Sequence, residues 1–349
     1  MAKKKYRVEL VYEKRLRNPK CFLVKDVRVR DRKGKVRKYL GTKQPTHQEL
    51  KNYRTQYAFE IEARAAKKKA ELTSSFYTSD YLTKQEIIEL EEIKYIYQTL
   101  LGLMTTSEIE AYERGFEIHY IQGTTAIEGN TLSIKEAQDL LLFDVLPEDK
   151  TLREINEVQN FKKVARYRNS YKGKITLDFI KTLHSLTVAN IDNETAGIFR
   201  RSDIVGISGC DLRSTPYLLI EEELNHLISR YYDAIKNNKN PFEQGIIFHY
   251  EFEIIHPFAD GNGRVGREIL NFMLNTNKFP KLLFLGKYRE NYIKALRFGN
   301  KNDYREMIKI FANLIKEQRA KIFRKNLQEL VKSTPRTGQL MLTDFGDVN

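Results

Sequence analysis

The sequence contains few cysteines and no long apolar run. Cys21 and Cys210 are its only cysteines, so we expect free thiols in a reducing compartment and no disulfide framework. The longest apolar candidate, residues 140–146, is interrupted by Asp144, and it is far shorter than the roughly 20 residues of a membrane span. The first residues lack the apolar core of a signal peptide. We therefore expect a globular protein of the cytoplasm that does not contact a membrane.

Positive charge is concentrated at one end of the chain. The net charge is +14, and residues 1–45 hold 17 basic and 4 acidic residues. Alternating residues over 6–12 and strand-like stretches at 21–30 and 36–40 predict a three-stranded antiparallel sheet, with a turn at Lys33-Gly34-Lys35. Such a basic module is either a surface for nucleic acid or an acidic protein, or a solvated sheet face.

Two capping boxes predict the next helices. The box at Thr46 opens a long helix to about Leu72, and the box at Thr83 opens a helix whose apolar side includes Ile87 and Leu90. We interpret residues 46–104 as a helical connector or an oligomerisation arm, which makes a homodimer one hypothesis. A further helix is expected from about Thr106 towards Glu128.

The densest chemistry lies between residues 256 and 267, which read His-Pro-Phe-Ala-Asp-Gly-Asn-Gly-Arg-Val-Gly-Arg. Apolar spacing predicts a helix over 241–255, and Pro257 takes His256 out of the right-handed helical conformation. The helical pattern resumes from Glu268. Residues 261–263 are thus expected to form a loop at a helix N-terminus, where free N–H groups attract anions.

Other interpretations of this stretch stay open at this point. The glycine spacing matches a dinucleotide fingerprint, but no strand precedes it. The same glycines match a phosphate-binding P-loop, but Arg267 and Glu268 stand where Lys and Ser or Thr are needed. Two Glu-x-x-His pairs, at 223–226 and 253–256, suggest a di-metal bundle, although two further carboxylates cannot be identified. A glycine loop that only joins two core helices is the structural alternative.

The stretch resembles the Fic family signature, His-Pro-Phe-x-Asp/Glu-Gly-Asn-Gly-Arg-x-x-Arg, and every fixed position is present. The resemblance covers about residues 105 to 320. It implies a mainly helical enzyme that transfers AMP from ATP to a Ser, Thr or Tyr hydroxyl of a protein or of itself. His256 is then the general base and Asp260 the Mg²⁺ ligand. The implied phosphate-binding residues, of which Arg264 also stabilises charge in the reaction, are Gly261, Asn262, Gly263, Arg264 and Arg267.

The resemblance also implies regulation and a docking place for the target. Residues 124–129, Thr-Thr-Ala-Ile-Glu-Gly, look like the family's inhibitory motif. Glu128 would pair with Arg267 and take the space of the γ-phosphate, and in some relatives the matching glutamate also promotes removal of AMP. A β-rich segment near Val205–Gly209 is similar to the flap that holds a target strand. Tyr288–Tyr292 resembles a segment that often borders the nucleotide base.

These observations combine into one expected architecture. We expect a mainly α protein with a basic β-rich module (1–45), a helical connector (46–104), a Fic-type bundle with a β-hairpin flap (105–330) and a flexible tail (331–349). Two competing functions remain. The same site could transfer another nucleotide, phosphocholine or phosphate, or the chain could be a nucleic-acid-binding regulator acting through its basic module.

Overall fold

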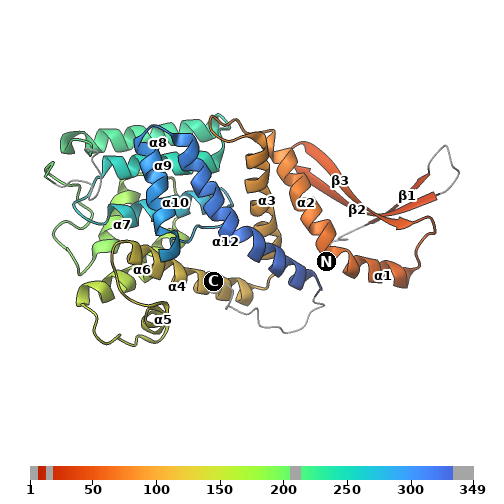
Figure 1. The fold of residues 1–349 in the computed structure, drawn as a ribbon, viewed down its shortest axis with the longest axis horizontal. Coiled ribbons are helices and arrows are strands. Elements are labelled where there is room, and N and C mark those ends of the chain that lie inside the picture. The colour runs from red at the N-terminus through yellow and green to blue at the C-terminus, as the bar shows by residue number, and fades with distance from the viewer. Residues whose placement is uncertain (1–6, 13–18, 205–213, 333–349) are drawn as a thin grey trace. The chain divides into compact units, whose positions relative to one another are not determined.

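The computed structural model describes residues 7–12, 19–204 and 214–332, and the fold is mainly helical, as expected (Figure 1). The strands are β1 (Arg7–Tyr12), β2 (Pro19–Val29) and β3 (Arg32–Gly41). The α-helices are α1 (His47–Gln56), α2 (Ala58–Ser74), α3 (Lys84–Leu101), α4 (Thr106–Ile127), α5 (Ile134–Phe143), α6 (Leu152–Ser170), α7 (Leu177–Val188), α8 (Ile220–Lys236), α9 (Pro241–Ile255), α10 (Asn262–Thr276), α11 (Arg289–Asn300) and α12 (Tyr304–Lys332). Two short 3-10 helices are η1 (Tyr217–Leu219) and η2 (Gly286–Tyr288).

The chain divides into two compact units. The first falls within residues 1–78, 83–109 and 316–341, and the second within 79–82, 110–315 and 342–349. The first unit thus contains the sheet, α1 to α3 and the later part of α12. The second contains the stretch from His256 to Arg267. The expected boundaries at residues 45, 104 and 330 stay predictions.

The sheet is antiparallel in the order β1-β2-β3, which agrees with the expected topology. The expected turn was wrong, however. The β2–β3 connection lies at Arg30 and Asp31, where Arg30 adopts a positive φ of 52°. Gly34 pairs with Val27 inside the hairpin. A two-residue connection with a left-handed residue suits the twist of paired strands, so the chain reverses before the glycine.

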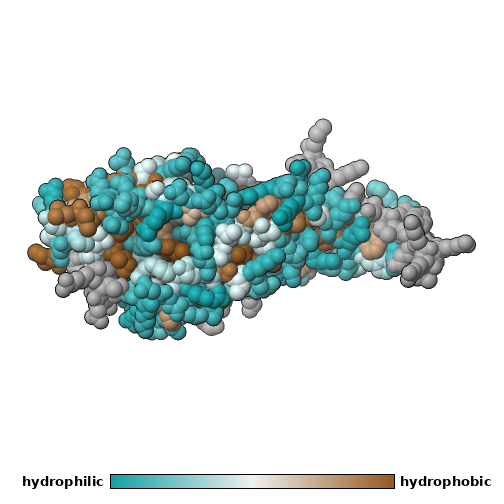
Figure 2. All heavy atoms as spheres, turned by 90° about the horizontal axis from the view of Figure 1, so that it is seen from above, coloured by the Kyte–Doolittle hydropathy of each residue, from teal (hydrophilic) through white to brown (hydrophobic). Residues whose placement is uncertain are grey.

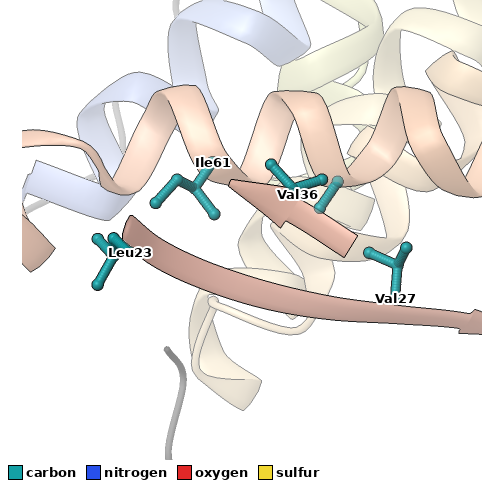
Figure 3. Close-up of a cluster of buried hydrophobic side chains, with 5 residues drawn as sticks. Leu23, Val27, Val36 and Ile61 are labelled. Atoms are coloured by element: carbon teal, nitrogen blue, oxygen red, sulfur yellow. The ribbon is translucent and has the colours of Figure 1, made fainter. Parts of the chain in front are cut away.

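One face of this sheet packs on α2. Leu23, Val27 and Val36 from β2 and β3 form a buried cluster with Ile61 and Ala65 of α2, and their side chains meet between strand and helix in Figure 3. Burial of large aliphatic side chains contributes about 1.5–3 kcal/mol each. The sheet and α2 therefore share one core.

Helix starts agree with the capping signals. Thr46 and Thr83 each form the expected capping box, and Ser133 and Thr151 form further boxes at the starts of α5 and α6. The long helix expected from Thr46 is interrupted, because Tyr57 leaves helical geometry between α1 and α2. The capping box determined where the helix begins, but nothing in the pattern marked this break.

The face drawn in Figure 2 is mostly hydrophilic with scattered apolar groups. Among the described residues, no helix combines the length and apolar character that crossing a bilayer requires.

Buried ion pairs join the helices that carry the site. Arg168 of α6 lies 2.7 Å from Glu268 of α10 and also pairs with Glu117 of α4. Lys281 reaches the same Glu117 at 2.6 Å. Breaking one partner of a buried pair is strongly destabilising, so this network fixes α4, α6 and α10 against one another.

Candidate functional site

His256 lies at the corner between α9 and the loop that follows. Its backbone has φ 49° and ψ 61°, so Pro257 ends the helix as expected, but His256 is left-handed and not extended. Nδ1 of His256 lies 3.3 Å from the carbonyl oxygen of Glu253. A carbonyl only accepts, so Nδ1 carries the proton and Nε2 keeps its lone pair. Burial lowers the pKa of His256 below its ordinary value of 6.5, which favours the neutral ring.

The loop from Pro257 to Gly261 is closed by Asn262. The side-chain oxygen of Asn262 accepts from the Phe258 N–H at 2.9 Å, and its amide nitrogen donates to the Phe258 carbonyl at 2.8 Å. Helix α10 already begins at Asn262, so the expected loop over 261–263 is shorter than predicted. Its side chain is buried and bonded through both its oxygen and its nitrogen, so Asn262 shapes the loop here. Its expected role at a phosphate stays a prediction.

His184 supports the same loop from α7. Its Nδ1 accepts the Gly197 N–H at 2.9 Å, so Nε2 carries the proton and donates to the Asp260 carbonyl at 3.0 Å. Its ring stacks on Phe258 with centroids 3.7 Å apart. Burial lowers the pKa of His184 to about 4. These contacts make His184 a buried structural histidine.

Glu128 and Arg267 meet at the start of α10. Nη2 of Arg267 lies 2.7 Å from Oε1 of Glu128. Two further bonds from Arg267 reach the Thr124 hydroxyl at 2.8 Å and the Thr124 carbonyl at 2.9 Å. A Cβ on Gly263 would lie 2.6 Å from the Glu128 carboxylate. The carboxylate therefore rests on the first turn of α10, where the helix dipole favours an anion.

Asp260 belongs to a ring of four charged groups. Its Oδ2 lies 2.6 Å from Arg153, and its Oδ1 lies 3.1 Å from Arg264. Glu157 closes the ring, at 3.1 Å from Arg264 and 3.3 Å from Arg153. Burial opposes ionisation of Asp260, but Arg264, the Gly261 N–H and Arg153 together hold its pKa below the ordinary value. Sequence analysis missed Arg153 and Glu157; their only signal was an i,i+4 charge pair on a helix.

Arg200 connects the neighbouring segment to the corner at His256. Its Nε donates to the His256 carbonyl at 2.8 Å, and its other nitrogens reach the carbonyls of Ser202 and Thr215 and the carboxylate of Asp203. Its backbone N–H donates to Pro257. Residues 197–200 contain no strand, and the contacts of Arg200 direct them to the loop. The expected flap segment Val205–Gly209 lies outside the described residues.

A buried cluster lies behind Arg267. The Tyr292 hydroxyl is 3.0 Å from Nε2 of His249, and its ring centroid is 5.7 Å from the Arg267 guanidinium. Burial lowers the pKa of His249 to about 3 and raises that of Glu253 to about 8. His249 is thus a buried structural residue. Tyr292 is 3% exposed, and the expectation that the segment Tyr288–Tyr292 borders a nucleotide base stays a prediction.

The donor set limits the metal chemistry of the site. Within the described residues, no group of three or more His, Cys, Asp or Glu side chains is arranged to hold a metal ion. The di-metal interpretation thus has no ligand set there. A single half-exposed carboxylate, that of Asp260, suits Mg²⁺ that arrives with phosphate oxygens and water as its other ligands.

Comparisons with known proteins agree with this geometry. Residues 174–274 match the model of the Fic/DOC family. The protein adenylyltransferase fic-1 of Caenorhabditis elegans is 30% identical over 201 residues, which are 55% of this chain and 38% of that protein. The protein adenylyltransferase Fic of Drosophila grimshawi is 25% identical over 239 residues, covering 66% and 48% of the two chains.

Solved structures show the same fold. The Fic-1 structure from C. elegans superposes with a TM-score of 0.60 at 22% identity, covering 81% of this chain and 84% of that one. A Fic domain containing signaling protein from Bacteroides thetaiotaomicron gives 0.59 at 18% identity, covering 70% and 97%. The chain therefore has the fold of the Fic proteins.

The chain matches the Fic/DOC family model over residues 174–274, which confirms the resemblance carried by residues 256–267. It spans 38% of the length of the C. elegans relative.

Proposed function

We propose that the chain transfers AMP from ATP to a hydroxyl of a target protein or of itself. Relatives named protein adenylyltransferase support this reaction. The observation that carries it is the state of His256. Its Nδ1 proton is held by the Glu253 carbonyl, so Nε2 is left to accept a proton, and the lowered pKa keeps the ring neutral. This is what a general base needs near neutral pH.

The chemistry follows from the groups around that corner. Nε2 of His256 takes the proton of a Ser, Thr or Tyr hydroxyl, whose oxygen attacks the α-phosphorus of ATP. A new P–O bond forms and pyrophosphate leaves. Arg264 and Arg267 lie on the first turns of α10 and stabilise the phosphate charge together with the helix dipole. Gly261 and Gly263 let phosphate oxygens approach the backbone closely.

Asp260 is the residue that would hold Mg²⁺. When bound, the ion would neutralise phosphate charge and orient the pyrophosphate leaving group. The Asp260 carboxylate is ionised, because its pKa is lowered.

Glu128 inhibits this reaction in the proposed scheme. Its carboxylate holds Arg267 and covers Gly263, which is where the outer phosphates of ATP would need to bind. Binding of ATP in a productive pose therefore requires Glu128 to leave. The same carboxylate would activate water for the reverse reaction, removal of AMP from a modified target. The target strand would dock near Val205–Gly209.

Intact-mass spectrometry after incubation with ATP and Mg²⁺ tests this function. Glu128→Gly should gain the mass of one AMP, and the double variant with His256→Ala should not, since losing a general base costs about 10²- to 10⁴-fold. Both proteins should keep the circular dichroism of the parent. A gain of phosphate mass, or AMP transfer by the double variant at the same rate, would contradict the proposal.

The basic module supports a second, separate proposal of contact with an anionic polymer such as nucleic acid. On the face of β2 and β3 opposite α2, exposed Arg28 pairs in register with exposed Lys33, and Phe22 packs against Tyr39 with ring centroids 5.5 Å apart. The Arg37 guanidinium lies 5.9 Å from the centroid of the Phe22 ring, and a cation beside an aromatic ring suits single-stranded nucleic acid. Salt-dependent retention of labelled RNA or DNA should be weaker for Arg28→Glu/Lys33→Glu. Equal retention by that variant would exclude this face.

A further inference from the structure

Arg153 occupies the exposed edge of the charged ring around Asp260. Its side chain is 58% exposed, whereas the side chains of Arg264 and Glu157, which close the buried side, are 2% and 7% exposed. Arg153 is also the second residue of α6, two positions after the capping residue Thr151. It can therefore swing into solvent while Arg264 and Glu157 stay paired.

The ring leaves Asp260 little capacity for a further cation. Oδ1 already accepts from the Gly261 N–H at 2.6 Å and from Arg264 at 3.1 Å. Oδ2 is the remaining oxygen, and Arg153 holds it at 2.6 Å. A divalent ion that bound there would lie beside a guanidinium of the same sign. Asp260 cannot keep Arg153 and gain a metal ion without strong repulsion.

We propose that Arg153 stands in the place of the divalent cation at Asp260, so that arginine and metal compete for one carboxylate oxygen. This inference rests on the proposed function and adds a second autoinhibitory contact to that of Glu128. Glu128 occupies the place at Arg267 where a phosphate would bind, which we call the anion seat. Arg153 occupies the place at Asp260 where a divalent cation would bind, which we call the cation seat. Both seats empty only when nucleotide and metal arrive together, and Arg153 acts as a positioning residue that sets the metal concentration required.

Two opposite effects follow for Arg153→Gln. The variant removes the competitor, so the divalent ion should bind more tightly, by about two- to five-fold as expected for a half-exposed ion pair. It also leaves the negative charge of Asp260 without its exposed partner, so nucleotide without metal should bind more weakly. A variant that merely damaged the fold would weaken both interactions.

The test uses full-length protein that carries Glu128→Gly, so that the anion seat is open. Free Mn²⁺ is titrated by electron paramagnetic resonance with saturating α,β-methylene ATP, which cannot transfer AMP. Binding of the same analogue in EDTA is measured by calorimetry. Arg230→Gln is the matched control, because Arg230 is 61% exposed and pairs with Glu251 between α8 and α9. Arg153→Lys keeps the charge and should lie nearer the parent.

The proposal would be supported if Arg153→Gln bound Mn²⁺ more tightly and the metal-free nucleotide more weakly, while Arg230→Gln bound both as the parent does. Unchanged or weaker Mn²⁺ binding in Arg153→Gln would overturn it while leaving AMP transfer intact. Absence of nucleotide-dependent Mn²⁺ binding in the Glu128→Gly parent would overturn this inference and the metal-assisted function together.

Discussion

Replacing Glu128 by glycine should make the protein less stable but more responsive to ATP. The substitution removes the carboxylate 2.7 Å from Arg267, whose side chain is 1% exposed. Arg267 keeps its two bonds to Thr124 and its place over the rings of Phe284 and Tyr292, with centroids at 5.8 and 5.7 Å. The guanidinium is thus partly satisfied without Glu128.

The magnitude follows from this partial satisfaction. Removing one partner of a buried polar group costs about 1–3 kcal/mol, and Glu128 is 37% exposed, which favours the lower half of that range. For a unit of this size, each kcal/mol lowers the melting temperature by about 2–4 °C. We expect a loss of about 2–8 °C without ligand.

Melting curves with and without ATP and Mg²⁺ measure both effects. A ligand at one hundred times its dissociation constant stabilises by about 2.7 kcal/mol. Glu128→Gly should gain more from ATP than the parent, because its anion seat is free. Glu128→Gln, which keeps an oxygen for Arg267 but no charge, should lie between them. Equal ATP shifts in parent and Glu128→Gly would refute the view that the carboxylate blocks the phosphates, and unchanged stability would refute the value given to the ion pair.

Two further outcomes are expected. AMP transfer by Glu128→Gly should slow as pH falls through the pKa of His256, which burial places below 6.5, since only the neutral ring accepts a proton; initial rates that halve at or above pH 6.5 would contradict this. Gly266→Ala should lose about 1–3 kcal/mol of stability, because its Cβ would overlap the Glu253 carboxyl and approach the His249 ring to 3.1 Å. Gly286→Ala is the control, because a Cβ at Gly286 would meet no heavy atom within 4 Å. Equal urea unfolding midpoints for the two variants would show that the side chains around Gly266 move to make room, which would contradict the prediction.

Local signals in the sequence located most of this architecture. Capping residues such as Thr83 and Ser133 determine helix starts through hydrogen bonds within four residues, so they can be read without tertiary structure. The His256 corner was predictable for the same reason. The break at Tyr57 and the β2–β3 turn were not, since packing decides which of several permitted reversals is used.

In the candidate site too, some contacts could be predicted from the sequence and others could not. The pairing of Glu128 with Arg267 was expected from two recognisable motifs and is present at 2.7 Å. The link from Arg153 to Asp260 joins residues 107 apart in the sequence. No local pattern distinguishes such an arginine from one that faces solvent. The bonds between the Asn262 side chain and the Phe258 backbone were not predictable either, and the role of Asn262 at a phosphate stays a prediction.

The contacts of Arg200 bear on both the loop at His256 and the two flanks of residues 205–213. One guanidinium connects the His256 carbonyl with Ser202 and Thr215, which flank residues 205–213 on either side. These bonds run to main-chain carbonyls, so they do not depend on which side chains Ser202 and Thr215 carry. If the target docks between those anchors, as proposed above, loss of Arg200 would disturb the His256 loop and the docking segment together.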